Sequence, residues 1–316
     1  MSKIKTLVTL FRGKDWGADL HSEVPPEIDL TFLEPGQTLS DHLDGVEVLY
    51  GVIAEKDLPK AEALRWVQLN STGADSMMYP AFLDSGIQLT CLGGAITGTV
   101  AEHALTMLFA LARNLHLQRD LQHEKKWQVV CGCEISGMTL GILGFGRIGR
   151  AIASRARGFD MDIIAVDPYP TEKPDFVRAL WGVDRLPDLL QQSNAVICAV
   201  PKTPSTYRMI SADQLNMMPR GSFIVNIARG GVIDEDALVE AVRSGQIAGA
   251  GIDVTDVEPC PADSPLWDEP GILLTPHSAG FSKDLKEKKI GWFIGNLKRY
   301  VAGEPLQGLV DTSQGF

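Results

Sequence analysis

Cysteine is scarce in this chain, with five residues among 316, and their number is odd. Such a count is typical of reduced thiols in the cytosol and differs from the dense, even sets of secreted disulfide scaffolds. We therefore expect a cytoplasmic protein. Cys131 and Cys133 are interpreted as two free thiols in a loop, because no second pair completes a set of metal ligands.

Long apolar runs are also missing. No stretch reaches the roughly 18–20 apolar residues that a membrane helix needs. The longest uncharged segment, 85–101, contains four glycines and three threonines. The apolar run near the N-terminus is ended by Arg12, too early for the core of a signal peptide, so we interpret it as a first strand. The sequence thus favours a protein that is not inserted in a membrane.

Positive charge is in the minority. Lys and Arg total 29 against 40 Asp and Glu, which gives a formal net charge of −11. Proteins that bind nucleic acid or a membrane surface usually carry a basic face, so both classes of partner are disfavoured. The length of 316 residues exceeds the roughly 250–300 residues at which single cores stop growing. The chain is therefore expected to form two domains.

The first part of the chain alternates short apolar runs with polar or helical segments. Helices are expected over Asp57–Leu64 and Ala81–Ser85. Strand–helix alternation at this spacing is typical of a parallel α/β sheet. The five candidate strands are Lys5–Phe11, Ile28–Leu33, Val46–Val52, Trp66–Asn70 and Gln88–Cys91.

A long helical pattern then runs from about Thr99 to Lys126. Its apolar residues recur with the period of a helix. A helix of that length predicts a connector between two lobes or a contact between subunits.

The pattern becomes regular from Thr139 onward, where nearly unbroken apolar runs are typical of strands covered on both faces. One helix is expected between Asp234, its N-cap, and Gly245, its C′ residue. A last helix, over Lys288–Val301, is expected to return to the first lobe. The six candidate strands, which together predict a doubly wound dinucleotide-binding domain, are Thr139–Leu143, Asp162–Val166, Ala195–Val200, Ser222–Ala228, Ala248–Val254 and Ile272–Thr275.

A glycine-rich turn between strand and helix predicts the cofactor site. Residues 144–149 read Gly-Phe-Gly-Arg-Ile-Gly and match G-x-G-x-x-G, in which the glycines allow a tight turn and close approach of the pyrophosphate. The helix that follows offers free N–H groups to the phosphates. Asp167 ends the next strand, where a carboxylate accepts both ribose hydroxyls of NAD and repels a 2′-phosphate. NAD is therefore favoured over NADP.

Three ionisable residues follow neighbouring candidate strands, at the sheet edge where ligands of such folds bind. They are Arg229, Glu258 and His277. An arginine can hold a carboxylate or carbonyl through two parallel hydrogen bonds. His277 can exchange a proton with a carbonyl or alcohol oxygen, and Glu258 beside it would favour the imidazolium and fix its orientation. This trio suits reduction of a 2-oxoacid by hydride without a metal.

Metal-ligand spacings are not found. Glu102-His103 has no second histidine four residues on, so the H-E-x-x-H pattern is not matched. His103 is accordingly interpreted as a structural or solvated residue of the long helix.

Five segments together carry a family resemblance: residues 140–153 (LGILGFGRIGRAIA), 226–238 (NIARGGVIDEDAL), 251–259 (GIDVTDVEP), 273–280 (LLTPHSAG) and 296–311 (NLKRYVAGEPLQGLVD). In their order and spacing, the chain resembles the D-isomer-specific 2-hydroxyacid dehydrogenases from about Trp66 to the C-terminus. The resemblance implies that Arg229, Glu258 and His277 are catalytic, the same trio that the strand ends indicate.

The resemblance also implies an architecture and further site residues. A flavodoxin-like substrate domain, residues 1–98 and 285–316, would be separated by a cleft from a Rossmann-type NAD-binding domain, residues 99–284. Thr72 and Gly73 would hold the substrate carboxylate together with Arg229, and a homodimer would form through the long helix 99–126. The implied cofactor residues are Gly144, Gly146, Arg147, Ile148, Gly149, Asp167, Pro201, Thr206, Ile227, Ala228, Arg229, Asp253, His277 and Gly280, with Asp253 at the nicotinamide amide and Thr206 near the phosphates.

The chain departs from the family pattern at a few positions, which leave the substrate open. Lys202 stands where an apolar residue or a histidine is common, and Phe281-Ser282 replaces a small residue and threonine. The expected activity is hydride transfer between NAD(H) and a small D-2-hydroxyacid/2-oxoacid pair. Two alternatives remain: an NAD(H)-sensing, corepressor-like binding protein of the same fold, or a dehydrogenase of an inorganic anion such as phosphite.

Overall fold

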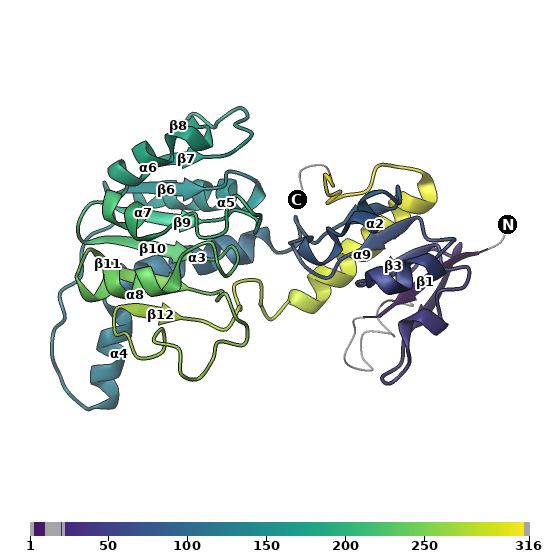
Figure 1. Ribbon diagram of the computed structural model, residues 1–316, viewed down its shortest axis with the longest axis horizontal. Helices are drawn as coiled ribbons and strands as arrows, with labels where there is room; N and C mark the ends of the chain where they lie inside the picture. Colours follow the sequence, from purple (N-terminus) through teal and green to yellow (C-terminus); the bar gives the residue numbers. More distant parts are fainter. Residues whose placement is uncertain (1–2, 10–19, 21–22, 313–316) are drawn as a thin grey trace. The chain divides into compact units, whose positions relative to one another are not determined.

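The structure is a computed structural model and describes residues 3–9, 20 and 23–312. The chain divides into two compact units (Figure 1). Unit 1 combines residues 1–96 with residues 282–316, and unit 2 consists of residues 97–281. One unit is thus inserted into the other along the chain.

Unit 1 is built on a five-stranded sheet of order β2-β1-β3-β4-β5 in which every strand pair is parallel. This is the flavodoxin-like doubly wound order. All five expected strands form, each shorter than its apolar run, and part of the run Lys5–Phe11 lies outside the described residues. The strands are β1 Ile4–Val8, β2 Ile28–Phe32, β3 Val48–Tyr50, β4 Trp66–Gln68 and β5 Gln88–Thr90.

The connections of unit 1 are mostly single turns: η1 Leu39–Asp41, η2 Glu55–Lys60, η3 Asp75–Met77 and α2 Pro80–Leu83. The helix expected over Asp57–Leu64 is wrong, because the segment forms the 3₁₀ helix η2 with Pro59 inside it. Proline has no N–H to donate and its ring clashes with the preceding turn, which disfavours a longer α-helix there.

Helix α9, Leu285–Ala302, covers one face of this sheet. Phe293 packs against Tyr50 and Trp66, with ring centroids 4.6 and 5.8 Å apart. The buried Asn296 donates to Gln68 Oε1 at 3.0 Å. The helix expected over Lys288–Val301 therefore forms, three residues earlier than its apolar pattern begins, and packs on the first lobe.

Unit 2 contains a seven-stranded parallel sheet of order β12-β11-β10-β9-β6-β7-β8. Read from β8, this order follows the 3-2-1-4-5-6 sequence of the Rossmann fold, with one further strand. All six expected strands are present, and the sheet has a seventh strand that the sequence did not predict. The strands are β6 Thr139–Leu143, β7 Asp162–Val166, β8 Val177–Trp181, β9 Ala195–Cys198, β10 Ser222–Asn226, β11 Ile247–Ile252 and β12 Ile272–Leu274. The additional one, β8, is an edge strand with only Val177 buried, and Arg178 interrupts its apolar residues.

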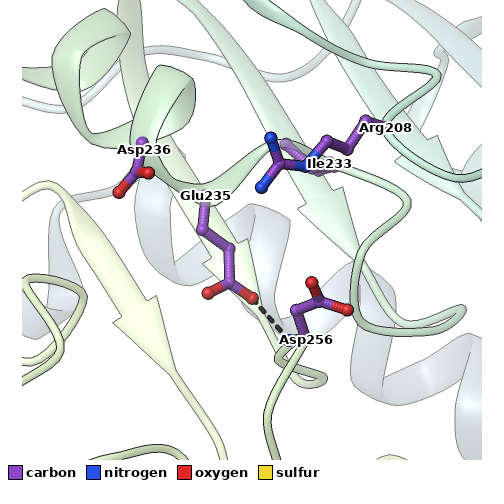
Figure 2. A pocket seen from close by; sticks show the side chains of 5 residues that line it. All are labelled: Arg208, Ile233, Glu235, Asp236 and Asp256. Carbon is purple, nitrogen blue, oxygen red and sulfur yellow. Dashed lines mark hydrogen bonds between the residues drawn. The ribbon is translucent and has the colours of Figure 1, made fainter.

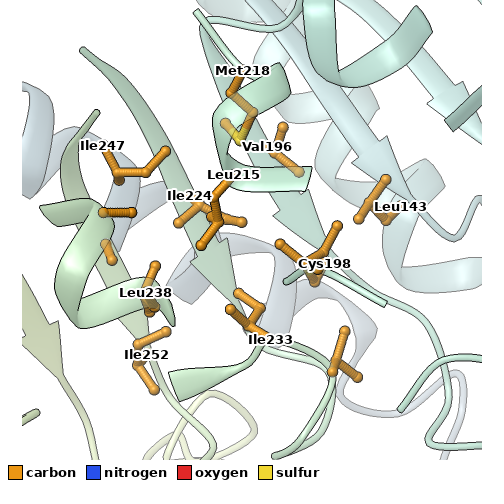
Figure 3. Close-up of a cluster of buried hydrophobic side chains, with 14 of the residues drawn as sticks. Leu143, Val196, Cys198, Leu215, Met218, Ile224, Ile233, Leu238, Ile247 and Ile252 are labelled. Carbon is orange, nitrogen blue, oxygen red and sulfur yellow. The ribbon is translucent and has the colours of Figure 1, made fainter. Parts of the chain in front are cut away.

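Helices cover both faces of the second sheet. Figure 3 shows one face, where Ile252 and Ile224 share a buried cluster with Leu238. Side chains alternate along a strand, so Gly249 and Gly251 face the other side, where α3 packs closely on β11. The helices are α3 Thr97–Ala112, α5 Arg147–Ala156, α6 Leu186–Gln192, α7 Ala212–Met217 and α8 Glu235–Arg243. The expected N-cap of α8 is confirmed, since Asp234 accepts from Ala237 N at 3.2 Å.

The single long helix expected over 99–126 is wrong. The segment forms α3 and a separate helix α4, Leu115–His123. Asn114 between them has a φ of 51°, the left-handed region that asparagine tolerates better than most residues. Its side chain donates to Cys131 O at 2.8 Å, which fixes the break.

Candidate active site

The glycine-rich turn after β6 has the shape that a dinucleotide requires. Gly144 has a φ of 89°, and a Cβ there would lie 2.6 Å from Ala199 O. A Cβ on Gly149 would collide with the carbonyl oxygen of Gly144, so helix and strand pack as closely as the motif predicts. Gly146, by contrast, is exposed, with open space where its Cβ would stand. That space allows a diphosphate to approach the backbone.

Helix α5 begins directly at this turn, with Gly146 as its N-cap and Arg147 exposed at its first position. The first turn of a helix presents N–H groups and partial positive charge to an anion. Asp167 follows β7 and borders the same turn, because its Oδ2 accepts from Phe145 N at 2.7 Å. Its Oδ1 accepts from Tyr169 N at 2.9 Å. The residues present therefore fit a dinucleotide, with a carboxylate beside the glycine turn.

The three expected ionisable residues follow three adjacent parallel strands, β10, β11 and β12. Their loops therefore leave the same edge of the sheet. His277 Nδ1 lies 2.8 Å from Glu258 Oε2, and both side chains are partly exposed. An ionised Glu258 accepts from Nδ1–H, which leaves Nε2 as the ring nitrogen that can exchange a proton. Glu258 Oε1 accepts from Thr255 N at 3.2 Å.

Arg229 ends a tight turn that the side chain of Asn226 stabilises. Asn226 Oδ1 accepts from Ala228 N and its Nδ2 donates to Arg229 O, both at 3.0 Å. Ile227 and Ala228 are buried, whereas Arg229 is partly exposed and donates from Nη1 to Ala228 O at 2.8 Å.

His277 itself has a left-handed backbone, with a φ of 51°. Such a conformation costs on the order of 1–3 kcal/mol in a residue other than glycine. Its N–H donates to Asp253 O at 2.7 Å, and the Asp253 carboxylate accepts from Ser278 N at 2.8 Å and Ala279 N at 3.0 Å. The backbone of His277 and of the two residues that follow it is thus held by one buried aspartate.

Comparisons with known proteins agree with this geometry. Residues 105–279 match the model of the D-isomer specific 2-hydroxyacid dehydrogenase, NAD binding domain. A glyoxylate reductase of Korarchaeum cryptofilum is 37% identical over 84% of this chain and 82% of its own length. The chain belongs to the D-isomer specific 2-hydroxyacid dehydrogenase family. It is an NAD-dependent oxidoreductase of that class.

Two further members of the family match nearly the whole chain. An (S)-sulfolactate dehydrogenase of Chromohalobacter salexigens is 33% identical over 93% of this chain and 97% of its own. A D-isomer specific 2-hydroxyacid dehydrogenase of Xanthobacter autotrophicus Py2, solved in complex with NADPH and MES, superposes with a TM-score of 0.86. That solved chain is 28% identical, and the match covers 100% of both chains.

Asp253 of this dehydrogenase has partners that its sequence position does not reveal. His103, from α3, places Nε2 3.4 Å from Asp253 Oδ1 and 3.1 Å from Thr275 Oγ1, and Thr275 Oγ1 donates to Asp253 at 2.6 Å. Burial raises the pKa of Asp253, but the hydrogen bonds from His103, Thr275 and the two amides outweigh it and hold that pKa below its usual value. The contact of Asp253 with the nicotinamide amide stays a prediction.

The other expected residues of the dehydrogenase lie in well-defined loops. Thr206 folds the loop after β9, since its hydroxyl donates to Pro201 O at 2.7 Å and accepts from Thr203 N at 2.8 Å. In unit 1, Thr72 and Gly73 follow β4, where Ser71 Oγ donates to Gly73 O at 2.7 Å. Their contacts with cofactor or substrate stay predictions from the resemblance.

Among residues 3–9, 20 and 23–312, no group of three or more His, Cys, Asp or Glu side chains is placed to hold a metal ion. Within the same ranges, every helix is too short or too polar to cross a membrane.

Proposed function

We propose that this dehydrogenase interconverts a small D-2-hydroxyacid and the corresponding 2-oxoacid, with His277 as general acid and base. The observation that carries the proposal is the 2.8 Å contact between His277 Nδ1 and Glu258 Oε2 at the end of β12. Arg229, beside them at the end of β10, supplies the cation that an anionic substrate needs.

Each side chain has a distinct role in reduction. The glycine turn 144–149 and Asp167 would hold NADH, which would supply a hydride to the substrate. His277 Nε2 gives its proton to the carbonyl oxygen, and takes a proton from the alcohol in the reverse direction. Glu258 stabilises the imidazolium and aligns the ring through Nδ1. The guanidinium of Arg229 binds the carboxylate and polarises the carbonyl through its N–H donors.

The two domains have different proposed roles. Residues 99–284 are proposed as the cofactor domain, and residues 1–98 with 285–316 as the substrate domain. Asp167 selects NAD, because its carboxylate beside the glycine turn accepts ribose hydroxyls and repels a 2′-phosphate. The names of the relatives, a glyoxylate reductase and a sulfolactate dehydrogenase, support a short 2-oxoacid as substrate.

The experiment is a panel of 2-oxoacids assayed with NADH and NADPH side by side. Glyoxylate, hydroxypyruvate, pyruvate, phenylpyruvate and 3-sulfopyruvate differ in length and in the charge at C3. We expect NADH oxidation with at least one of the short acids, and lower kcat/KM with NADPH. Absence of turnover with every acid, in a preparation that binds NADH, would contradict the proposal.

We also propose a homodimer, formed around α4 and the loop that follows it. Helix α4 buries none of its residues, and Leu115 is 55% exposed. Trp127 is fully exposed and Val129 is 80% exposed. Neighbouring large apolar side chains in water commonly mark a contact with another protein.

The sparse cysteines support a reducing compartment, the cytoplasm, for the assembled enzyme.

A further inference from the structure

Asp256 is the point at which several strand-end loops meet. Lys202 Nζ, from the loop after β9, lies 2.9 Å from Asp256 Oδ1, and Tyr207 Oη donates to Oδ2 at 3.2 Å. The backbone N–H of Asp256 donates to Glu235 Oε1 of α8 at 2.6 Å. Figure 2 shows Glu235 and Asp256 joined in this way, with Arg208 facing them. One side chain thus ties the loop after β9 to the loop after β11.

The same loop presents Glu258 to His277. Asp256 stands two residues before Glu258. The turn between them is closed by Thr255, whose N–H donates to Glu258 Oε1 at 3.2 Å and whose Oγ1 donates to Val257 O at 2.7 Å. In so short a turn, the position of Asp256 determines where the Glu258 carboxylate lies.

The segment that carries Arg229 packs against this turn as well. A Cβ on Gly230 would collide with Thr255 O, and a Cβ on Gly231 would lie 2.6 Å from Asp256 Oδ1. Arg208 N donates to Gly231 O at 2.6 Å. The loops of Arg229, Glu258 and the cofactor-flanking segment therefore share one junction.

Lys202 balances negative charge at the Asp256 junction. Asp256 faces Glu235, and Asp234 and Asp236 lie nearby on the chain. The hydrogen bond from Lys202 is the main cause that lowers the pKa of Asp256, with help from Tyr207 and Arg208. Arg208 is itself engaged with Asp234 at 3.3 Å. Without Lys202, the carboxylate of Asp256 would lose its main positive partner and its link to the loop after β9, while Glu235 would stay close to it.

We propose that Lys202 and Tyr207 are positioning residues that hold the Asp256 junction and thereby aim Glu258 at His277. The inference rests on the proposed function. The Asp256 junction links the loop that flanks the cofactor to the acid–base pair.

The test compares Lys202→Met, Asp256→Asn, the double variant and Lys202→Arg with the wild type. We expect each single variant to lose roughly five- to twentyfold in kcat, and the double variant to lose no more than the worse single one. Lys202→Arg should recover most of the activity, because a guanidinium can pair with Asp256. The dissociation constant of NADH should stay within about twofold.

The control is Arg178→Met, which removes the 2.7 Å pair with Asp162 at the far edge of the same sheet and should leave kcat unchanged. Unchanged kcat in Lys202→Met would overturn the inference. So would weaker NADH binding in Lys202→Met but not in Asp256→Asn, because Lys202 would then act on the cofactor directly. An inactive wild type would instead refute the proposed function. The Asp256→Asn variant keeps its side-chain shape and provides the test if Lys202→Met does not fold.

Discussion

His277 Nδ1 and Glu258 Oε2 lie 2.8 Å apart, although the two residues follow different strands of the sheet. The contact orients the imidazole and occupies Nδ1 with the carboxylate. In the proposed mechanism Nε2 then meets the substrate, so that proton transfer and its electrostatic support come from two separate loops. Each can be altered independently.

Replacing His277 with glutamine should abolish most of the turnover. The amide preserves size and polarity but cannot exchange a proton. We expect kcat to fall by roughly 10²–10⁴, the usual size of a general acid–base contribution. Binding of NADH, measured by its fluorescence, should be nearly unchanged. Activity close to that of the wild type would remove His277 from the mechanism.

Glu258→Gln removes the negative charge beside the imidazole and keeps the shape of the side chain. In the proposed mechanism the carboxylate orients the imidazole through a charge-assisted hydrogen bond, which an amide replaces with a weaker one. We therefore expect kcat for the 2-oxoacid to fall by roughly tenfold, while the dissociation constant of NADH stays nearly unchanged. Steady-state kinetics and NADH fluorescence of both proteins measure these quantities. An unchanged kcat would show that Glu258 does not support His277.

Asp253→Asn tests the carboxylate beneath the His277 loop. Because the folded pKa of Asp253 lies below its usual value, about 3.9, this group stabilises the fold above that pH. The stabilisation is lost as the pH falls through the lowered folded pKa. The variant should be less stable by about 1.5–3 kcal/mol at pH 7, the size of hydrogen bonds to a charged group.

Urea denaturation at pH 7 and at pH 3 measures this effect. The difference between wild type and Asp253→Asn should shrink at the lower pH, where the wild-type carboxylate is losing its advantage. Asp29→Asn, at an exposed position on β2, provides the matched control without such a difference. Equal stability of both proteins at pH 7 would contradict the role assigned to Asp253.

Asp167→Ala tests the choice of cofactor. Removing the carboxylate beside the glycine turn relieves its repulsion of a 2′-phosphate and removes the acceptor of the ribose hydroxyls. The ratio of kcat/KM for NADH over NADPH should fall by roughly tenfold, which corresponds to about 1.4 kcal/mol of the electrostatic interaction. Asp160→Asn, at an exposed left-handed position in the same unit, should leave the ratio unchanged. A constant ratio in Asp167→Ala would refute the selection.

Trp127→Ser tests the proposed dimer contact. If the exposed indole is buried between two copies of the chain, its loss should weaken association by tenfold or more, since large aromatic anchors dominate such interfaces. Sedimentation velocity over a range of concentrations measures this. Val183→Ser, at another exposed apolar residue of unit 2, should have no effect. A monomeric wild type would contradict the dimer outright.

The sequence predicts those features that local patterns encode. Strands β6 and β7 begin and end where their apolar runs do, and the glycine turn adopts the expected shape because its motif lies within six consecutive residues. The trio Arg229, Glu258 and His277 could be selected because each follows a strand, and parallel strands end at one edge. These inferences need only the order of the elements.

Other features depend on contacts between distant residues or on a single dihedral angle. Strand β8 lacks an apolar run because only one of its faces touches the core. The break at Asn114 is invisible in a helical pattern that continues on both sides of it. His103 and Asp253, 3.4 Å apart in space, are separated by most of the cofactor domain in sequence, so no spacing rule connects them.

The placement of α9 sets an order of events during synthesis. Unit 2 is one continuous segment of the chain and is synthesised without interruption. The sheet of unit 1 is synthesised before it, and helix α9, which covers that sheet, after it. Until residues 285–302 emerge, Tyr50 and Trp66 lack the partner Phe293 that buries them in the finished fold. The nascent chain therefore carries these two aromatic side chains without their partner for the whole time that the second unit is translated.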